Sequence, residues 1–223
     1  MEKMILEKKN DLNIDMQGMP SSLEPLASEM QAIMEMRNLY HSAIREVSTK
    51  LEILDDEFQV KNDYNPIHHM ECRVKSLQST MEKIEKKGFD ICADSMKKIT
   101  DIAGIRVICN YVDDIYKIAE LLIKQDDIEL VRERDYIEHP KESGYRSLHL
   151  IVIVPVFLAE KTEKVPVELQ IRTIAMDTWA SLEHELKYKS NEDLSEEAVK
   201  SLRQCAEDMA AIDEKMQRIH KKL

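Results

Sequence analysis

Apolar residues recur at alternating steps of three and four from residue 23 to residue 58, which is the spacing of one buried face of an α-helix. The pattern predicts a long helix that Ser22 can cap, with Pro25 in its first turn and only Arg37 interrupting the apolar face. A second helix is predicted from about residue 67 to residue 86, ending at Gly88. The apolar face of the first helix consists of Leu23, Leu26, Met30, Ile33, Tyr40, Ile44, Val47, Leu51, Leu54 and Phe58.

The middle of the chain changes to patterns that are typical of strands. A buried strand is predicted at 105–111, an amphipathic helix at 113–125, and further strands at 129–137, 148–157 and 165–173. Residues 176–189 then have the pattern of a helix. The order β-α-β-β-β between helices predicts an α+β fold, in which a mixed central sheet of about five strands is flanked by helices.

The two ends of the chain differ in their patterns. Residues 1–20 show no sustained period and are predicted to be a loose arm, followed by a main domain at 21–190 and a helical segment at 191–223. Ser195 can cap this last helix, whose stripe could pack within the chain or form a subunit interface; the pattern leaves both open. The stripe consists of Val199, Leu202, Ala206, Met209, Ile212, Met216, Ile219 and Leu223.

Composition narrows the class of protein. The net charge of -11 at pH 7 argues against duplex DNA as a partner, and the sequence gives no specific indication of single-stranded RNA, although a local basic cleft could bind it. The four cysteines form no C-x-x-C pair, so neither a zinc site nor a disulfide framework is indicated. No stretch approaches about 18 apolar residues and no signal peptide begins the chain, so we expect a cytoplasmic protein without a membrane span.

The fifteen residues from Asp135 to His149 combine two cations, three carboxylates, two histidines and two tyrosines around one glycine. A turn needs Ser143 and Gly144, but it does not need Tyr145 and an arginine beside them. A solvated polar turn would explain the charges alone. The combination of an aromatic ring with cations favours a nucleotide-binding loop.

Two carboxylates lie on or beside separate predicted strands. Glu168 is on the polar side of the strand 165–173, and Asp101 precedes the strand 105–111. Together they could hold Mg²⁺, which is usually bound by one or two carboxylates and by phosphate oxygens. With glycine only at 18, 88, 104 and 144, the chain has neither a Walker A loop nor G-x-G-x-x-G, so side chains would have to bind a triphosphate. The candidate cations are Arg73, Lys75, Arg106, Arg134, Lys141, Arg146 and Arg172.

Several ordered motifs resemble the synthetase domain of the RelA/SpoT alarmone enzymes, over about residues 60–190. In helical layout the chain resembles a stand-alone small alarmone synthetase of the RelP/RelQ type, with a nucleotidyltransferase-like fold. Members of that family transfer the β,γ-pyrophosphate of ATP to the ribose 3′-hydroxyl of GDP or GTP. The motifs are Asp101-Ile-Ala-Gly-Ile-Arg106, Asp135-Tyr-Ile, Pro140-Lys141, Gly144-Tyr145-Arg146-Ser147-Leu148-His149, Glu168-Leu-Gln-Ile-Arg-Thr173 and Trp179-Ala-Ser-Leu-Glu-His184.

The resemblance implies a role for each candidate residue. Asp101 would ligate Mg²⁺, and Glu168 would help to hold the metal and act as the base toward the 3′-hydroxyl. Asp177 stands where, by this resemblance, several relatives carry asparagine near guanine, and a carboxylate can accept from guanine N1–H and its amine. The implied ATP-binding residues are Arg73, Lys75, Arg106, Arg134 and Glu183, and the implied GDP- or GTP-binding residues are Lys141, Tyr145, Arg146, His149, Gln170 and Asp177.

The resemblance also implies ATP and GDP or GTP as substrates and a homo-oligomer, most often a tetramer built through terminal helices. The chain has no His-Asp dipeptide, the motif of the family's hydrolase half, so we expect synthesis only. Nucleotidyl transfer would require two acids close together in a pattern such as Asp-x-Asp, and the chain has no Asp-x-Asp. The other alternative is a catalytically weak alarmone- or RNA-binding regulator with the same fold, against which the joint presence of Asp101, Glu168 and Tyr145 argues.

Overall fold

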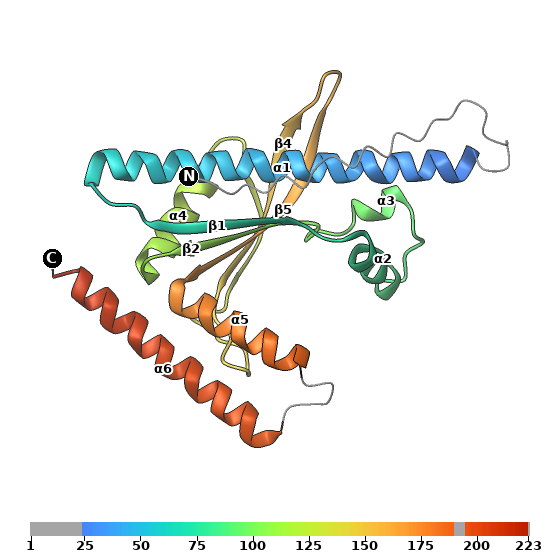
Figure 1. Cartoon of the computed structure of the whole chain (residues 1–223). Coiled ribbons are helices and arrows are strands. Elements are labelled where there is room, and N and C mark those ends of the chain that lie inside the picture. Colours follow the sequence, from blue (N-terminus) through green and yellow to red (C-terminus); the bar gives the residue numbers. More distant parts are fainter. Residues whose placement is uncertain (1–23, 190–194, 223) are drawn as a thin grey trace.

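The computed structural model describes residues 24–189 and 195–222 and contains one five-stranded mixed sheet (Figure 1). The strand order is β1-β2-β5-β4-β3, with β2 and β5 parallel and the other neighbours antiparallel. This confirms the predicted α+β class and its mixed sheet. The strands are β1 (Ile67–Val74), β2 (Ala103–Cys109), β3 (Glu129–Asp135), β4 (Leu148–Phe157) and β5 (Thr162–Thr173).

Helices cover the two faces of the sheet unequally. The long helix α1 crosses one face, whereas α5 and α6 lie together on the other side (Figure 1). The predicted helices at 113–125 and 176–189 and after Ser195 are confirmed within a few residues, and Ser195 accepts a hydrogen bond from the Ala198 backbone N–H. The helices are α1 (Glu24–Asn62), α2 (Leu77–Lys86), α3 (Ala93–Met96), α4 (Val112–Ile123), α5 (Ile174–Lys189) and α6 (Glu196–His220).

The main hydrophobic core lies between the sheet and the helices α1 and α4. Alternate residues of the three central strands point into it, as the period of two along a strand requires. From α1 the core receives Tyr40, Val47 and Leu51, each at most 1% exposed. Burying a side chain of this size contributes about 1.5–3 kcal/mol, so this face dominates the stability of the fold.

Arg37, the one polar residue in the apolar face of α1, has a specific partner. Its Nη1 donates to the carbonyl oxygen of Lys75, 3.1 Å away, just after β1 ends. The break in the apolar pattern therefore marks the place where α1 binds the end of an edge strand.

The single helix predicted at about 67–86 is wrong in its first half. Residues 67–74 form β1, which pairs antiparallel with β2, and the helix α2 begins only at Leu77, capped by Ser76. Most β1 side chains are exposed, so no apolar alternation marks this segment in the sequence. Pairing with β2, a long-range interaction, makes it a strand and completes the five.

Helix α6 is attached to the rest of the chain along its length. Trp179 Nε1 on α5 donates to the Leu202 carbonyl at 2.8 Å, and Thr173 Oγ1 donates to Asp213 Oδ2 at 2.6 Å. Near its C-terminus, Gln217 Oε1 accepts from the first turn of α4. The intramolecular packing that the sequence left open is thus present for part of the stripe.

Gly144 shows how closely α6 approaches the loop between β3 and β4. Its φ is +92°, a conformation that favours glycine, and a Cβ at this position would lie 2.6 Å from Ala206 Cβ. The loop and α6 could not pack this closely with any larger residue at position 144.

The predicted arm at 1–20 and the capping residue Ser22 lie outside the described residues. Across the described helices, no segment has both the length and the apolar character needed to cross a bilayer.

Candidate active site

A row of polar side chains crosses the face of the sheet opposite to α1. Strand pairing aligns five positions, one from each strand, and alternation places all five side chains on this face. The row consists, in spatial order, of Glu71, Arg106, Gln170, His149 and Arg134. Register therefore brings together four residues that the sequence predicted as nucleotide ligands, although they lie up to 64 positions apart.

An open cleft of about 530 Å³ occupies this face above β1, β2 and β5. Both predicted metal ligands, Asp101 and Glu168, line the cleft. The remaining lining residues are Glu71, Cys72, Arg73, Gly104, Ile105, Arg106 and Gln170. The expectation that two carboxylates from separate segments share one cleft is met, with two of the predicted cations beside them.

Asp101 is held by two lysines. Its Oδ2 lies 3.1 Å from Lys75 Nζ and 2.5 Å from Lys83 Nζ, while among the described residues its buried Oδ1 has no hydrogen-bond partner. Burial by itself would raise the pKa of Asp101, but the hydrogen bonds from Lys83 and Lys75 outweigh it and hold this pKa below its ordinary value. Asp101 is therefore ionised near neutral pH and has one oxygen free for a cation.

Lys83 is a site residue that the sequence reasoning missed. It lies on α2, eighteen positions before Asp101, and nothing in its local pattern distinguishes it from Lys86, the other lysine of that helix. Only the packing of α2 beside the entrance to β2 brings its ammonium to the carboxylate.

Glu168 is oriented by a neighbour on the same strand. Gln170 Nε2 donates to Glu168 Oε2 at 3.2 Å, and Gln170 Oε1 accepts from Arg172 Nη2 at 2.7 Å. Arg172 Nη2 also donates to Tyr145 Oη at 2.6 Å. The sequence included Arg172 among the cations but gave it no role; alternation with Glu168 and Gln170 was the signal that placed it on this face.

His149 lies between Tyr145 and Glu168. Its Nε2 is 2.8 Å from Tyr145 Oη, and its Nδ1 is 3.9 Å from Glu168 Oε1. Burial, together with the positive charges of Arg172, Lys141 and Arg134, lowers the pKa of His149 to about 4. The imidazole is therefore neutral near pH 7, and its contact with Glu168 is not an ion pair there.

Asp177 lies between two arginines. Its Oδ1 is 3.1 Å from Arg172 Nη1 and 3.5 Å from Arg106 Nη1, at the start of α5. Arg106 also pairs with Glu71, at 2.9 Å. The carboxylate that the sequence assigned to guanine is thus engaged by protein cations in this structure.

Aromatic rings and a cation gather beside His149. Lys141 Nζ lies 4.5 Å from the centroid of the Tyr145 ring and 4.7 Å from that of Tyr136. Arg134 donates to Tyr136 Oη at 3.4 Å. The loop therefore offers π-faces and positive charge together, as its composition predicted.

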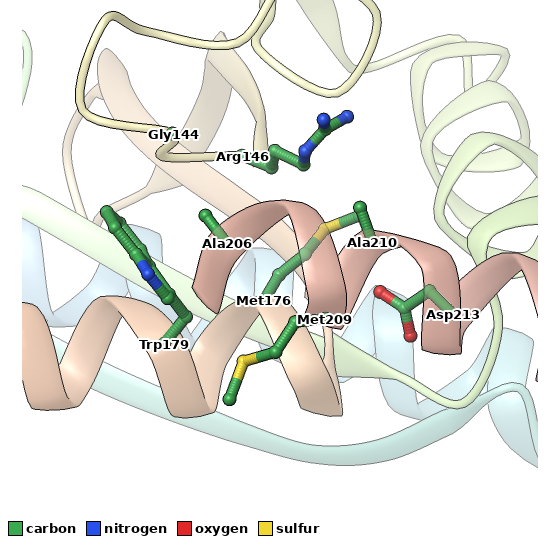
Figure 2. Close-up of a pocket in the computed structure, with 8 residues that line it drawn as sticks. All are labelled: Gly144, Arg146, Met176, Trp179, Ala206, Met209, Ala210 and Asp213. Carbon is green, nitrogen blue, oxygen red and sulfur yellow. The ribbon is translucent and has the colours of Figure 1, made fainter. Parts of the chain in front are cut away.

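Two predicted residues lie outside these contacts. Arg146 donates to the Ile137 carbonyl at 3.1 Å and lines a pocket between the loop, α5 and α6, where its guanidinium extends away from Trp179 and Met209 (Figure 2). Glu183 is half-buried further along α5 and is not among the residues that line the cleft. Their predicted nucleotide contacts are not tested by this geometry.

The arrangement suits a particular class of chemistry. Ionised carboxylates and fixed cations in an open cleft can bind metal-complexed phosphates, and the neighbouring rings can stack on a base. Fold and site together define a nucleotide-binding phosphoryl- or pyrophosphoryl-transfer enzyme.

Comparison with known proteins gives the family. Residues 72–193 match the region found in RelA/SpoT proteins. The chain is 44% identical over 186 residues to the GTP pyrophosphokinase YwaC of Bacillus subtilis, an alignment that covers 83% of this chain and 89% of that protein. The chain therefore belongs to the RelA/SpoT family, as the sequence motifs predicted.

Solved structures agree with this assignment. The crystal structure of small alarmone synthetase 2 from Bacillus subtilis superposes with a TM-score of 0.77 at 42% identity, covering 84% of this chain and 98% of that one. That of small alarmone synthetase 1 from the same organism, bound to its product pppGpp, gives 0.75 at 36% identity, covering 82% and 94%.

The depressed pKa of His149 predicts how stability changes with pH. In the range from about 6.5 to about 4, unfolded His149 takes up a proton that the folded side chain does not, so acid favours the unfolded state. We expect the unfolding free energy of the metal-free protein to fall with a slope approaching about 1.4 kcal/mol per pH unit from this residue. Urea titrations at a series of pH values measure it.

The variant His149→Asn should lose this contribution, whereas His139→Asn, which replaces an exposed histidine of the same loop, should keep it. The same pH dependence in wild type and His149→Asn would show that the folded imidazole titrates normally.

Proposed function

We propose that this chain is a GTP pyrophosphokinase, which transfers the β,γ-pyrophosphate of ATP to the ribose 3′-hydroxyl of GDP or GTP and releases AMP. The products are ppGpp from GDP and pppGpp from GTP. The observation that carries this proposal is that Asp101 and Glu168 share one cleft with Arg73 and Arg106, in a chain whose relatives are named for this reaction.

Glu168 is the proposed general base. A ribose hydroxyl is a weak nucleophile near pH 7, so a carboxylate that takes its proton during attack lowers the barrier. The 3′-oxygen forms a bond to the β-phosphorus, the bond from that phosphorus to the oxygen of the α-phosphate breaks, and AMP leaves with the electron pair. The hydrogen bond from Gln170 fixes one carboxylate oxygen of Glu168. Because His149 is neutral, it does not form an ion pair with the other oxygen.

The donor triphosphate is assigned to the cations around Asp101. Lys75 and Lys83 already contact its carboxylate, and Arg73 and Arg106 line the same cleft. The two lysines can neutralise charge on the pyrophosphoryl group as it is transferred, without rearranging during the reaction. Arg73 and Arg106 are assigned, by resemblance, to the two faces of adenine. Arg134 and Glu183 are assigned to the donor by resemblance alone.

The two cleft carboxylates fit a divalent metal, and we infer Mg²⁺. Among the described residues, no three histidine, cysteine, aspartate or glutamate side chains gather as a metal site. Magnesium is usually held by one or two carboxylates with water and phosphate completing its coordination, and the unpartnered Oδ1 of Asp101 is a suitable ligand beside Glu168. When bound, the metal would offset the negative charge of the phosphates.

The acceptor is assigned to the aromatic loop. Guanine would stack on Tyr145, and Lys141 and His149 would contact acceptor phosphate or ribose. Gln170, Asp177 and Arg146 complete the proposed acceptor set.

Synthesis without hydrolysis stays a prediction. The alternative of a catalytically weak regulator is not favoured, because the proposed base and metal ligands share one open cleft.

We propose a homo-oligomer, most simply a tetramer, in which α6 takes part. Its stripe divides in the structure: Leu202 and Met209 pack against Trp179 and Ala206, whereas another part remains exposed. The exposed members are Val199, Ile212, Met216 and Ile219, each 46–55% accessible. Only the exposed members can bind a second copy without disrupting the fold.

Glu168→Gln should lower kcat by about 10²–10⁴-fold, because it removes the base and keeps the shape of the side chain. Affinity for ATP, measured by calorimetry without acceptor, should change far less. Glu163→Gln is the matched control, since it neutralises another carboxylate of the same strand, which lies in the β4–β5 hairpin and does not line the cleft, and we expect it to keep most of kcat. Retention of more than about a third of wild-type kcat by Glu168→Gln would exclude its role as the base.

Tyr145→Ala should raise the KM for GDP or GTP by about 5- to 150-fold, because a stacking platform contributes about 1–3 kcal/mol per base. The KM for ATP should stay within about twofold of wild type, since the residue belongs to the acceptor side. Steady-state kinetics with each substrate varied in turn measure both constants. Equal increases in the two KM values would mean that the ring does not stack on the acceptor base.

Replacing Ile212 and Ile219 together by glutamate should lower the mass measured by light scattering, because unpaired charges would be forced into an apolar contact. Both side chains are about half exposed, so the melting temperature of the subunit should change little. Phe157→Glu, at an exposed residue of the β4–β5 hairpin, is the control and should keep the wild-type mass. A monomeric wild type at micromolar concentration would contradict the proposed interface.

A further inference from the structure

Arg172 is almost completely buried beneath the polar face of the sheet, at 4% exposure. Its two terminal nitrogens make three hydrogen bonds: Nη1 donates to Asp177, and Nη2 donates to both Tyr145 Oη and Gln170 Oε1. A buried arginine is costly unless it is paired, and Asp177 provides the opposite charge.

Two chains of contacts lead from Arg172 to the same carboxylate. In the first chain, Arg172 donates to Gln170, and Gln170 Nε2 donates to Glu168 Oε2. In the second chain, Arg172 donates to Tyr145 Oη, which contacts His149 Nε2, and His149 Nδ1 lies 3.9 Å from Glu168 Oε1. The five side chains, Glu168 included, form a closed ring of contacts.

The Gln170 side chain can have only one orientation in this ring. Arg172 has donors and no acceptor, so it must face the carbonyl oxygen of Gln170, and the amide nitrogen must then face Glu168. Without Arg172 the amide could turn, presenting its oxygen to the carboxylate and repelling it. Arg172 thereby determines which group Gln170 offers to the base.

We propose that Arg172 is a positioning residue that holds the base Glu168 and the stacking ring of Tyr145 at a set distance and orientation. This rests on the proposed roles of Glu168 and Tyr145 in pyrophosphate transfer. Through Asp177, which also lies 3.5 Å from Arg106, Arg172 further connects the acceptor side of the site to the donor cleft. Small displacements of reacting groups cost large factors in rate, so such a ring acts mainly on kcat.

The side chain must be arginine for geometric reasons. Its planar guanidinium holds its two terminal nitrogens in fixed directions, so one nitrogen can donate to Asp177 while the other donates to Tyr145 and Gln170. A lysine would keep the positive charge but, as a point charge on a flexible stem, could not maintain all three bonds. Arg172→Lys therefore separates the charge of the residue from its geometry.

The test is a double-mutant cycle between Arg172→Lys and Tyr145→Phe. Tyr145→Phe keeps the ring for stacking and removes only the hydroxyl that Arg172 binds. We expect each single variant to lower kcat, by about tenfold or more for Arg172→Lys, with the KM for ATP little changed. The double variant should be no slower than Arg172→Lys, because the link is already broken.

Tyr136→Phe is the matched control. Its hydroxyl accepts from Arg134 and not from Arg172, although its ring lies 6.1 Å from that of Tyr145. Its effect should add to that of Arg172→Lys. Additive effects of Arg172→Lys and Tyr145→Phe, or full activity of Arg172→Lys, would overturn the proposal.

Circular dichroism and thermal unfolding establish that each variant folds. If Arg172→Lys does not, the cycle is made between Asp177→Asn and Tyr145→Phe, since Asp177 anchors the other nitrogen of Arg172. Coupling is again expected, and additivity again overturns the proposal.

Failure of the proposed base would look different. An active Glu168→Gln enzyme would exclude Glu168 as the base, yet the coupling between Arg172 and Tyr145 would still be measurable in GDP binding by calorimetry. If Glu168→Gln is inactive and the effects in the double-mutant cycle are additive, the proposed function stands and Arg172 is excluded as a positioning residue.

Discussion

The register of the three central strands is the constraint on which the rest of the structure depends. Because side chains alternate along a strand, a slip of one residue would turn Glu168, Gln170 and Arg172 into the core and expose the apolar residues between them. Those apolar residues pack beneath α1 and α4, where each buried aliphatic side chain contributes about 1.5–3 kcal/mol. The free energy that holds the core together therefore also aligns the polar row on the opposite face.

Charge balance within the site is the second physical feature. Asp101 has two lysines as partners, and Asp177 has two arginines, so the cations are held in place before any nucleotide binds. Such preorganised groups need not rearrange when charge develops on a transferred pyrophosphoryl group. The acidic net charge of the chain does not oppose this, because these cations are gathered around two carboxylates of the site.

The apolar stripe of helix α6 has two sides, one packed within the chain and one exposed. One side contacts α5 and the loop at Gly144, and so supports the segment that carries Tyr145. The other side exposes aliphatic residues to solvent. A sequence stripe does not distinguish these two sides, since both have the helical period. The supporting side connects the C-terminal helix to the loop that carries Tyr145.

The sequence by itself determined helices α1, α4, α5 and α6, four of the five strands, the α+β class and the family, because these depend on local periodicity and on short ordered motifs. Tertiary structure alone decided that residues 67–74 form a strand, since pairing with β2 outweighs a weak local pattern. It alone also placed Lys83 beside Asp101 and joined Arg172 to Glu168 in one ring of contacts. Such contacts join distant segments, and their geometry depends on packing and register, which no local pattern of residues encodes.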